Sequence, residues 1–262
     1  MRTNKVKRAL KNGEVVIGTM ISACRGAGVA TMMATAGFDY VFIDMEHSTF
    51  DMETVEEMIV ALKATDTMAF VRTPGLGRLE LQRPLDAGAD GLLVPQVSTV
   101  EEVRQIVNYM KYYPEGERGM ALRRGHSDYA PVKAAEYMKH ANEETMVVIQ
   151  VESKTAMRDI EQLVSVPGVD AAFIGPADLS QSYGKPGQNE DPEIMADLLH
   201  FIEVCNKHGV APGIHVYDMA KAKDWIDKGM RLICYSNDIS MIVDTGTGYT
   251  RELKSYIKGR GQ

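Results

Sequence analysis

Short apolar segments recur along the chain and alternate with stretches of helical periodicity. Eight of them are almost continuously apolar and are bounded by Gly, Pro or Asp: Val15 to Met20, Tyr40 to Ile43, Met68 to Val71, Gly91 to Val94, Met146 to Val151, Ala171 to Ile174, Val210 to Ile214 and Leu232 to Tyr235. Continuous apolar runs are typical of parallel strands buried on both faces. Their alternation with helices predicts an α/β fold, a (β/α)8 barrel, with residues 1–262 forming a single domain.

Capping residues mark the expected helix boundaries. Ser98 and Glu101 predict a capping box in front of a helix with apolar positions at i, i+3, i+4 and i+7. Three Gly-x-Asp phrases stand between a helix and a strand, at residues 37–39, 88–90 and 168–170. Their glycines predict left-handed helix ends. The stretch from Tyr112 to Asn142 is the one long interruption, and we expect it to be partly helical, functional or both.

Polar residues follow the predicted strands at the end where a (β/α)8 barrel carries its active site. Glu152 and Asp178 end consecutive strands, which lie about 4.8 Å apart in a sheet, so their carboxylates could meet at one divalent cation. Oxygen ligands of this kind favour Mg²⁺ or Mn²⁺, with Co²⁺ or Zn²⁺ as substitutes. Salt bridges at the rim would explain the same carboxylates without a metal.

Two further rim residues are candidates for catalysis. His47 follows a strand-end acidic segment, and an imidazole is a natural general base near neutral pH. Arg72 directly follows a strand, where a guanidinium could stabilise charge on a substrate oxygen or pair with an acid such as Asp44. A structural role is the alternative for His47. We expect the histidines of the long interruption and the helices to lie at the surface: His126, His140, His200 and His208.

Two other chemistries have weaker support. The segment Gly26 to Thr31 partly matches a dinucleotide-binding loop, but the third glycine is absent and the glycines stand several residues beyond the strand, which disfavours NAD. Lys154 is the one lysine near a predicted strand end. Because we expect it on the rim or at the start of a helix, Schiff-base catalysis is also disfavoured.

Composition narrows the class of protein. The 262 residues are 25% charged and 45% hydrophobic, as in ordinary globular proteins, and the net charge of −7 disfavours binding to nucleic acid or to a membrane surface. Cys24, Cys205 and Cys234 show no disulfide or metal spacing, which suits a reducing compartment. Without an apolar run of about 18 residues, neither a signal peptide nor a membrane span is predicted, and we expect a cytoplasmic protein.

Several segments, in order over residues 5 to 240, resemble the HpcH/HpaI family of class II pyruvate aldolases. They are Ala36 to His47, Val71 to Pro74, Leu85 to Ala89, Val94 to Pro95, Gln150 to Glu152, Phe173 to Ser180, Gly184 to Gly187 and Ala211 to Gly213. The resemblance implies a TIM barrel of the phosphoenolpyruvate/pyruvate-binding type that assembles as a homotrimer or homohexamer. It also implies that the C-terminal helix, from about residue 237 onward, packs on a neighbouring subunit.

The implied activity is metal-dependent, reversible cleavage of 4-hydroxy-2-oxo acids to pyruvate and an aldehyde. The resemblance makes Glu152 and Asp178 the metal ligands, His47 the proton acceptor and Arg72 the stabiliser of oxyanion charge. It assigns to Asp86 the task of raising the basicity of His47, although the sequence alone places Asp86 on a helix surface. The substrate's pyruvoyl part would be held by Gln150 and by the turn of Gly175, Pro176 and Ala177.

The sequence departs from the family pattern where the aldehyde would bind. His215 stands where relatives often have leucine, and the segment Arg118 to His126 is short and basic. We therefore hypothesise that Arg123, Arg124 or His215 contacts an acidic or hydroxylated aldehyde. A lyase acting on a CoA thioester such as malyl-CoA and a catalytically silent metal-binding barrel are the alternative functions. The lack of a basic nucleotide-binding extension disfavours the first, and the completeness of the catalytic set disfavours the second.

Overall fold

A computed structural model describes residues 2–260 and shows a closed barrel of eight parallel strands. The strands are β1 (Val16–Ile21), β2 (Tyr40–Asp44), β3 (Met68–Arg72), β4 (Gly91–Val94), β5 (Met146–Val151), β6 (Ala171–Ile174), β7 (Ala211–Val216) and β8 (Leu232–Asn237). Each strand pairs with its neighbours along the chain, and β8 closes onto β1. The predicted fold is confirmed. Three predicted strands, β4, β5 and β6, match the observed ones, and the other five differ by one or two residues at their ends.

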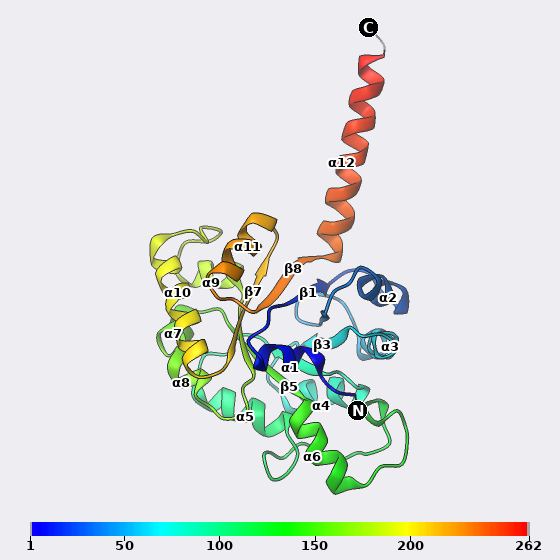
Figure 1. The fold of residues 1–262 in the computed structure, drawn as a ribbon, viewed down its shortest axis with the longest axis vertical. Coiled ribbons are helices and arrows are strands. Elements are labelled where there is room, and N and C mark those ends of the chain that lie inside the picture. Colours follow the sequence, from blue (N-terminus) through cyan, green and yellow to red (C-terminus); the bar gives the residue numbers. More distant parts are fainter. Residues whose placement is uncertain (1, 261–262) are drawn as a thin grey trace.

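Helices surround the barrel (Figure 1). They are α1 (Lys5–Lys11), α2 (Ala27–Thr35), α3 (Met52–Lys63), α4 (Arg78–Ala87), α5 (Val100–Met110), α6 (Ala134–Glu144), α7 (Lys154–Arg158), α8 (Ile160–Val164), α9 (Pro176–Ser182), α10 (Pro192–Lys207), α11 (Met219–Asp227) and α12 (Asp238–Gly259). One apolar core lies between the helices and the strands, and a second fills the barrel interior, where Val6 and Leu10 of α1 join it. The short helix α1 therefore closes the amino end of the barrel.

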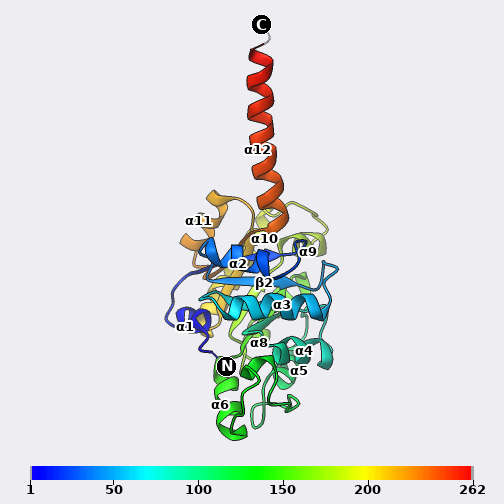
Figure 2. The ribbon, with the colours of Figure 1, turned by 90° about the vertical axis from the view of Figure 1, so that its right-hand side faces the viewer.

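Helix α12 differs from the others because it leaves the barrel and projects away from it, as two perpendicular views show (Figures 1 and 2). Large apolar side chains along it are exposed: Ile239, Ile242, Val243, Tyr249, Leu253, Tyr256 and Ile257. At about 100° per residue these positions all fall on one face of the helix and form one apolar stripe, which we call the α12 stripe. No helix within residues 2–260 is long and apolar enough to cross a membrane.

The three Gly-x-Asp phrases make the same backbone contact at three places in the barrel. Gly37 and Gly88 have positive φ angles directly after their helices, as predicted for left-handed helix ends. Gly168 also has a positive φ, but it lies in the turn after α8, which ends at Val164. Each aspartate then accepts a hydrogen bond from the backbone of the preceding strand, where Asp39, Asp90 and Asp170 bind the N–H groups of Ile17, Ala69 and Val147 at 2.8–2.9 Å. The phrase therefore fixes the register between β1 and β2, β3 and β4, and β5 and β6.

Two local predictions need correction. The capping box of α5 is formed by Thr99 and Glu102, one residue later than predicted, because the Glu102 carboxylate accepts hydrogen bonds from the backbone of both Ser98 and Thr99. His126 is buried rather than at the surface. Its Nδ1 lies 2.5 Å from the Tyr137 hydroxyl and its Nε2 lies 3.0 Å from the carbonyl of Ala121, so it orders the partly helical segment after α5.

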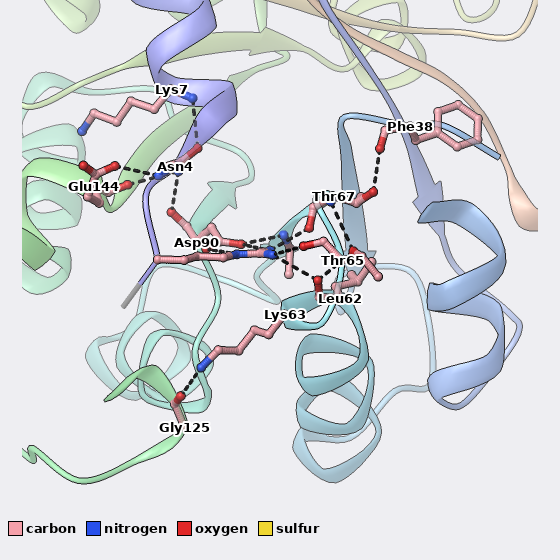
Figure 3. Close-up of polar contacts among 12 residues, drawn as sticks. Asn4, Lys7, Phe38, Leu62, Lys63, Thr65, Thr67, Asp90, Gly125 and Glu144 are labelled. Carbon is pink, nitrogen blue, oxygen red and sulfur yellow. Dashed lines mark hydrogen bonds and ion pairs between the residues drawn. The ribbon is translucent and has the colours of Figure 1, made fainter. Parts of the chain in front are cut away.

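A polar network joins the N-terminal segment to the barrel (Figure 3). The Asn4 side chain donates to the carbonyls of Asp90 and Glu144, and the Glu144 carboxylate accepts from the Asn4 backbone at 2.6 Å and from Arg8 at 2.6 Å. Burial disfavours the charged form of Glu144, but these hydrogen bonds outweigh it and lower its pKa. The carboxylate therefore stabilises the attachment of α1.

We expect Glu144→Gln to lower the free energy of unfolding by about 1–2 kcal/mol at pH 7, because a charged acceptor of buried hydrogen bonds is lost. Since the folded-state pKa is depressed, this contribution is present above the ordinary value near 4.3 and disappears as the pH falls through the folded-state pKa. Thermal melts of both proteins across the acid range should show their melting temperatures converging. Glu143→Gln, an exposed neighbour, is the control, and a gap independent of pH would contradict the prediction.

Candidate active site

A cavity of about 1020 Å³ opens where the strands β1, β2, β3, β5, β6 and β7 end. Its lining includes Met20, Ser22, Asp44, His47, Arg72, Gln150, Gly175, Pro176, Ala177, Asp178 and His215. This is the carboxyl end of the barrel, where the sequence places the catalytic chemistry. Most of the predicted site residues are therefore brought together on one cavity.

Arg72 and Asp44 form a buried ion pair in the wall of this cavity. Neighbouring in register on β3 and β2, they make a fork-shaped pair in which Nε and Nη2 of Arg72 each lie 2.8 Å from a carboxylate oxygen of Asp44. Burial disfavours the charged form of Asp44, but Arg72 outweighs it, and the pKa of Asp44 is lowered. Arg72 thus pairs with Asp44 and also lines the cavity. Its contact with a substrate oxygen stays a prediction.

Asp44 also shapes the turn that carries His47. One of its carboxylate oxygens accepts the backbone N–H groups of Glu46 at 3.0 Å and His47 at 3.3 Å. The His47 side chain is 59% exposed, and its Nε2 lies 3.7 Å from the Glu46 carboxylate. The imidazole therefore lines the cavity from a turn fixed by its backbone, and the acid beside it, Glu46, has a buried side chain that pairs with Arg72 at 3.2 Å.

Glu152 is buried beneath the cavity and Asp178 is exposed on its wall, in the first turn of α9. The Glu152 carboxylate accepts the Gln150 amide at 2.6 Å and the backbone N–H of Gln96 at 2.7 Å. Burial raises the pKa of Glu152 to about 7, and the charges of Glu46 and Asp178 add to the shift. A carboxylate in this position is costly unless a cation or a proton neutralises it.

Several features fit a divalent cation here. The Gln150 side-chain oxygen is buried without a hydrogen-bond partner, and Gly175 leaves open the space beside Glu152, since a Cβ there would lie 2.5 Å from the Glu152 carboxylate. No group of three His, Cys, Asp or Glu residues that could hold a metal occurs in the described residues. The protein's own carboxylate ligands would thus be Glu152 and Asp178, and Mg²⁺ commonly binds through two carboxylates with water or substrate completing its sphere.

Gln96 is a part of this site that the sequence did not point to. It has a positive φ of 57°, an unusual conformation for a residue with a side chain. In that conformation its backbone binds Glu152 while its amide donates to Glu46 at 3.2 Å. Gln96 therefore links two acids of the site, and the only sequence signal was its place after the strand β4.

Other predicted residues lie elsewhere in the single chain. Asp86 sits near the end of α4 and pairs with Arg118 at 2.8 Å, and it does not line the cavity with His47. Arg123 and Arg124 are exposed in the segment before α6 and do not line the cavity either. His215 does line it, and its Nε2 donates to the carbonyl of Ser236 at 2.9 Å. Burial lowers the pKa of His215 to about 4, so its ring is neutral at pH 7.

The two weaker chemistries find no support in the geometry. Lys154 is on the outside, where its ammonium forms an ion pair with Glu193 and lies 4.9 Å from the Tyr183 ring. Ala27, at the start of α2, donates its backbone N–H to the Glu57 carboxylate at 3.2 Å. An acid therefore occupies the position that the phosphates of a dinucleotide would take.

Comparison with known proteins gives a consistent result. The family model described as HpcH/HpaI aldolase/citrate lyase matches residues 20–244. A hydroxypyruvate/pyruvate aldolase of Roseobacter denitrificans is 34% identical, with 96% of this chain and 97% of that protein covered. A 4-hydroxy-2-oxo-heptane-1,7-dioate aldolase of Klebsiella pneumoniae is 34% identical, with 91% and 89% covered. The crystal structure of an HpcH/HpaI aldolase from Desulfitobacterium hafniense superposes with a TM-score of 0.92 at 30% identity, covering 97% of each chain.

Proposed function

The chain belongs to the HpcH/HpaI aldolase/citrate lyase family and is a pyruvate aldolase, and we propose that the cavity described above is its active site. The observation that supports this most directly is the convergence of His47, Arg72 and Asp178 on one cavity, with Glu152 directly beneath it. We propose 4-hydroxy-2-oxo acids as substrates, which the enzyme cleaves reversibly to pyruvate and an aldehyde.

In the proposed reaction, Gln150 and the turn formed by Gly175, Pro176 and Ala177 orient the 2-oxo acid. His47 accepts the proton of the C4 hydroxyl, the C3–C4 bond breaks, and its electron pair remains on the pyruvate enolate as the aldehyde forms. Arg72, already oriented by Asp44, stabilises the negative charge on the enolate oxygen.

A divalent cation held by Glu152 and Asp178 would supply Lewis-acid polarisation of the 2-oxo group. Mg²⁺ or Mn²⁺ suits these oxygen ligands, with Co²⁺ or Zn²⁺ as substitutes. The mechanism has no step at Asp86, because this residue pairs with Arg118 in the chain described.

The test is pyruvate release from a panel of 4-hydroxy-2-oxo acids, coupled to NADH oxidation by lactate dehydrogenase. We expect turnover that EDTA abolishes and that Mg²⁺, Mn²⁺ or Co²⁺ restores. Turnover that persists in EDTA would contradict the metal assignment. Turnover of malyl-CoA without turnover of any hydroxy-oxo acid would instead indicate a thioester lyase.

We further propose that the α12 stripe packs on a second copy of this chain, in a homotrimer or homohexamer. The stripe contains seven large apolar side chains that are between 45% and 66% exposed, and surfaces of this kind mark protein interfaces. On the barrel, Val15 and Ile17 before and in β1 are 39% and 45% exposed. A neighbouring helix would cover apolar surface of this kind.

Removal of residues 238–262 should leave a monomer. Light scattering and sedimentation of the full chain and of the shortened chain measure this directly. A double substitution on the stripe, Leu253→Lys with Tyr256→Lys, should have the same effect without shortening the chain. The exposed Lys254→Glu, which lies off the stripe, is the matched control. An unchanged mass for the double variant would contradict the proposal.

For the compartment, we propose the cytoplasm. The three cysteines are free, and Cys205 and Cys234 are buried. Burial raises the pKa of Cys24 as well as those of the two buried thiols. Thiols of this kind are compatible with a reducing environment.

A further inference from the structure

We propose that Asp238, at the start of α12, is a positioning residue for the active site. It holds the loop of residues 22–26, and this loop in turn supports the rim of the cavity and the turn that carries His47. The inference rests on the proposed function in one respect only, namely that the cavity and His47 carry the reaction.

The Asp238 side chain is fully buried, and its partners are backbone N–H groups together with the Cys24 thiol. Its carboxylate accepts hydrogen bonds from three consecutive residues of the loop, Ser22 at 3.0 Å, Ala23 at 3.0 Å and Cys24 at 2.6 Å. The backbone of Ile239 adds a fourth at 3.0 Å. Four donors need both oxygens of a carboxylate, because a carboxamide offers only one acceptor oxygen.

Capping of α12 does not explain this arrangement. The N-cap residue of the helix is Asn237, whose side chain accepts from the backbone of Ser240 at 2.8 Å. One oxygen of the Asp238 carboxylate accepts from the backbone of Ala23 and Cys24 in the loop and makes no hydrogen bond to the helix. The carboxylate serves the connection between α12 and the loop rather than the helix alone.

The backbone before Asp238 is irregular in a way that directs it toward the loop. Ser236 has a positive φ of 58°, and the register between β1 and β8 shifts so that Met20 faces Asn237. Irregularities of this kind re-aim the residues that follow and are common beside active sites. The Ser236 carbonyl is held by His215 at 2.9 Å and by Thr19 at 3.4 Å, so the cavity wall and the irregular strand share contacts.

The loop connects Asp238 with the catalytic side of the cavity. Ser22 lines the cavity directly. At the other end of the loop, Arg25 donates to the Thr49 carbonyl at 2.7 Å and to its hydroxyl at 2.9 Å, and it lies 5.5 Å from the Phe50 ring. Thr49 is two residues after His47, whose exposed side chain has few contacts of its own. The position of the imidazole therefore depends on its backbone, which Asp44 holds on one side and Arg25 supports on the other.

Limited trypsin digestion of Asp238→Asn tests this placement without relying on activity. We expect cleavage after Arg25 to be at least about ten-fold faster than in the wild type. The loop loses hydrogen bonds to a charged group, and this loss should raise the equilibrium constant for local opening of the loop by more than about ten-fold. We expect kcat/KM to fall by about ten- to a hundred-fold, since small misplacements of reacting groups have effects of this size. The exposed Asp244→Asn, on the same helix, should leave both unchanged.

An unchanged cleavage rate in Asp238→Asn would overturn the proposal, and it would do so even if the wild type showed no aldolase activity. If Asp238→Asn does not fold, Arg25→Met tests the second half of the connection, because Arg25 is exposed and its removal leaves the bonds of Asp238 intact. We expect a lower kcat with nearly unchanged KM and melting temperature. An unchanged kcat in Arg25→Met would also overturn it.

Discussion

Arg72→Lys is expected to lower kcat by about a hundred- to a thousand-fold, the effect of removing one donor aimed at developing oxyanion charge. Lysine keeps the positive charge but not the planar fork that binds Asp44 through two parallel hydrogen bonds. The lysine ammonium can donate in a fixed direction either to Asp44 or to the substrate oxygen. The arginine guanidinium can donate to both at once. KM should change much less, because the charge that Arg72 stabilises develops mainly in the transition state.

Steady-state kinetics of pyruvate release measures this effect, and thermal melts separate it from a loss of stability. Asp44 is 1% exposed and would be left with a poorer partner, so a moderate decrease in melting temperature is expected. Arg104→Lys, at an exposed position on α5, is the control and should behave as the wild type. An increase in KM at unchanged kcat would contradict the role, because it would mean that Arg72 only binds the ground state.

The barrel and the rim of the site are predictable because both depend on local sequence. Segments such as Ala171–Ile174 are apolar throughout, and such a run in an α/β protein indicates a strand covered on both faces. Once the strands are known, the side chains that follow them share one end of the barrel. Arg72 and Asp178 are located by that reasoning alone, and the structure places both on the cavity.

Residues whose place depends on distant parts of the chain could not be found in this way. Nothing in the sequence around Asp86 indicates that it pairs with Arg118, which lies 32 positions away. Gln96 has a positive φ, a conformation that glutamine rarely adopts and that the local sequence does not predict. Its contacts with Glu152 and Glu46 accompany this conformation. Asp238 lies more than two hundred residues from the loop it binds. Each of these contacts exists only when segments distant in the sequence have packed together.

The second large effect is expected for Glu152→Gln, which should weaken binding of Mn²⁺ by at least about a hundred-fold and abolish most turnover. Removal of a residue that only supports a metal ligand already lowers metal affinity or activity by about ten- to a hundred-fold, and we expect the loss of a ligand itself to cost more. Isothermal titration calorimetry with Mn²⁺ measures the affinity without substrate. Glu101→Gln, at an exposed position on α5, is the control and should bind the metal normally.

Stability without metal distinguishes a ligand from a structural acid. In Glu152→Gln the neutral amide loses a hydrogen bond to Gln96 or Gln150, but it also removes repulsion from Glu46 and Asp178. The metal-free melting temperature should therefore change little. In the wild type, saturating Mn²⁺ should raise the melting temperature, because a ligand that binds only the folded state stabilises it by mass action. Glu152→Gln should lose most of this increase. A variant that melts early without metal yet keeps the full increase would show that Glu152 supports the strand end and does not bind the cation.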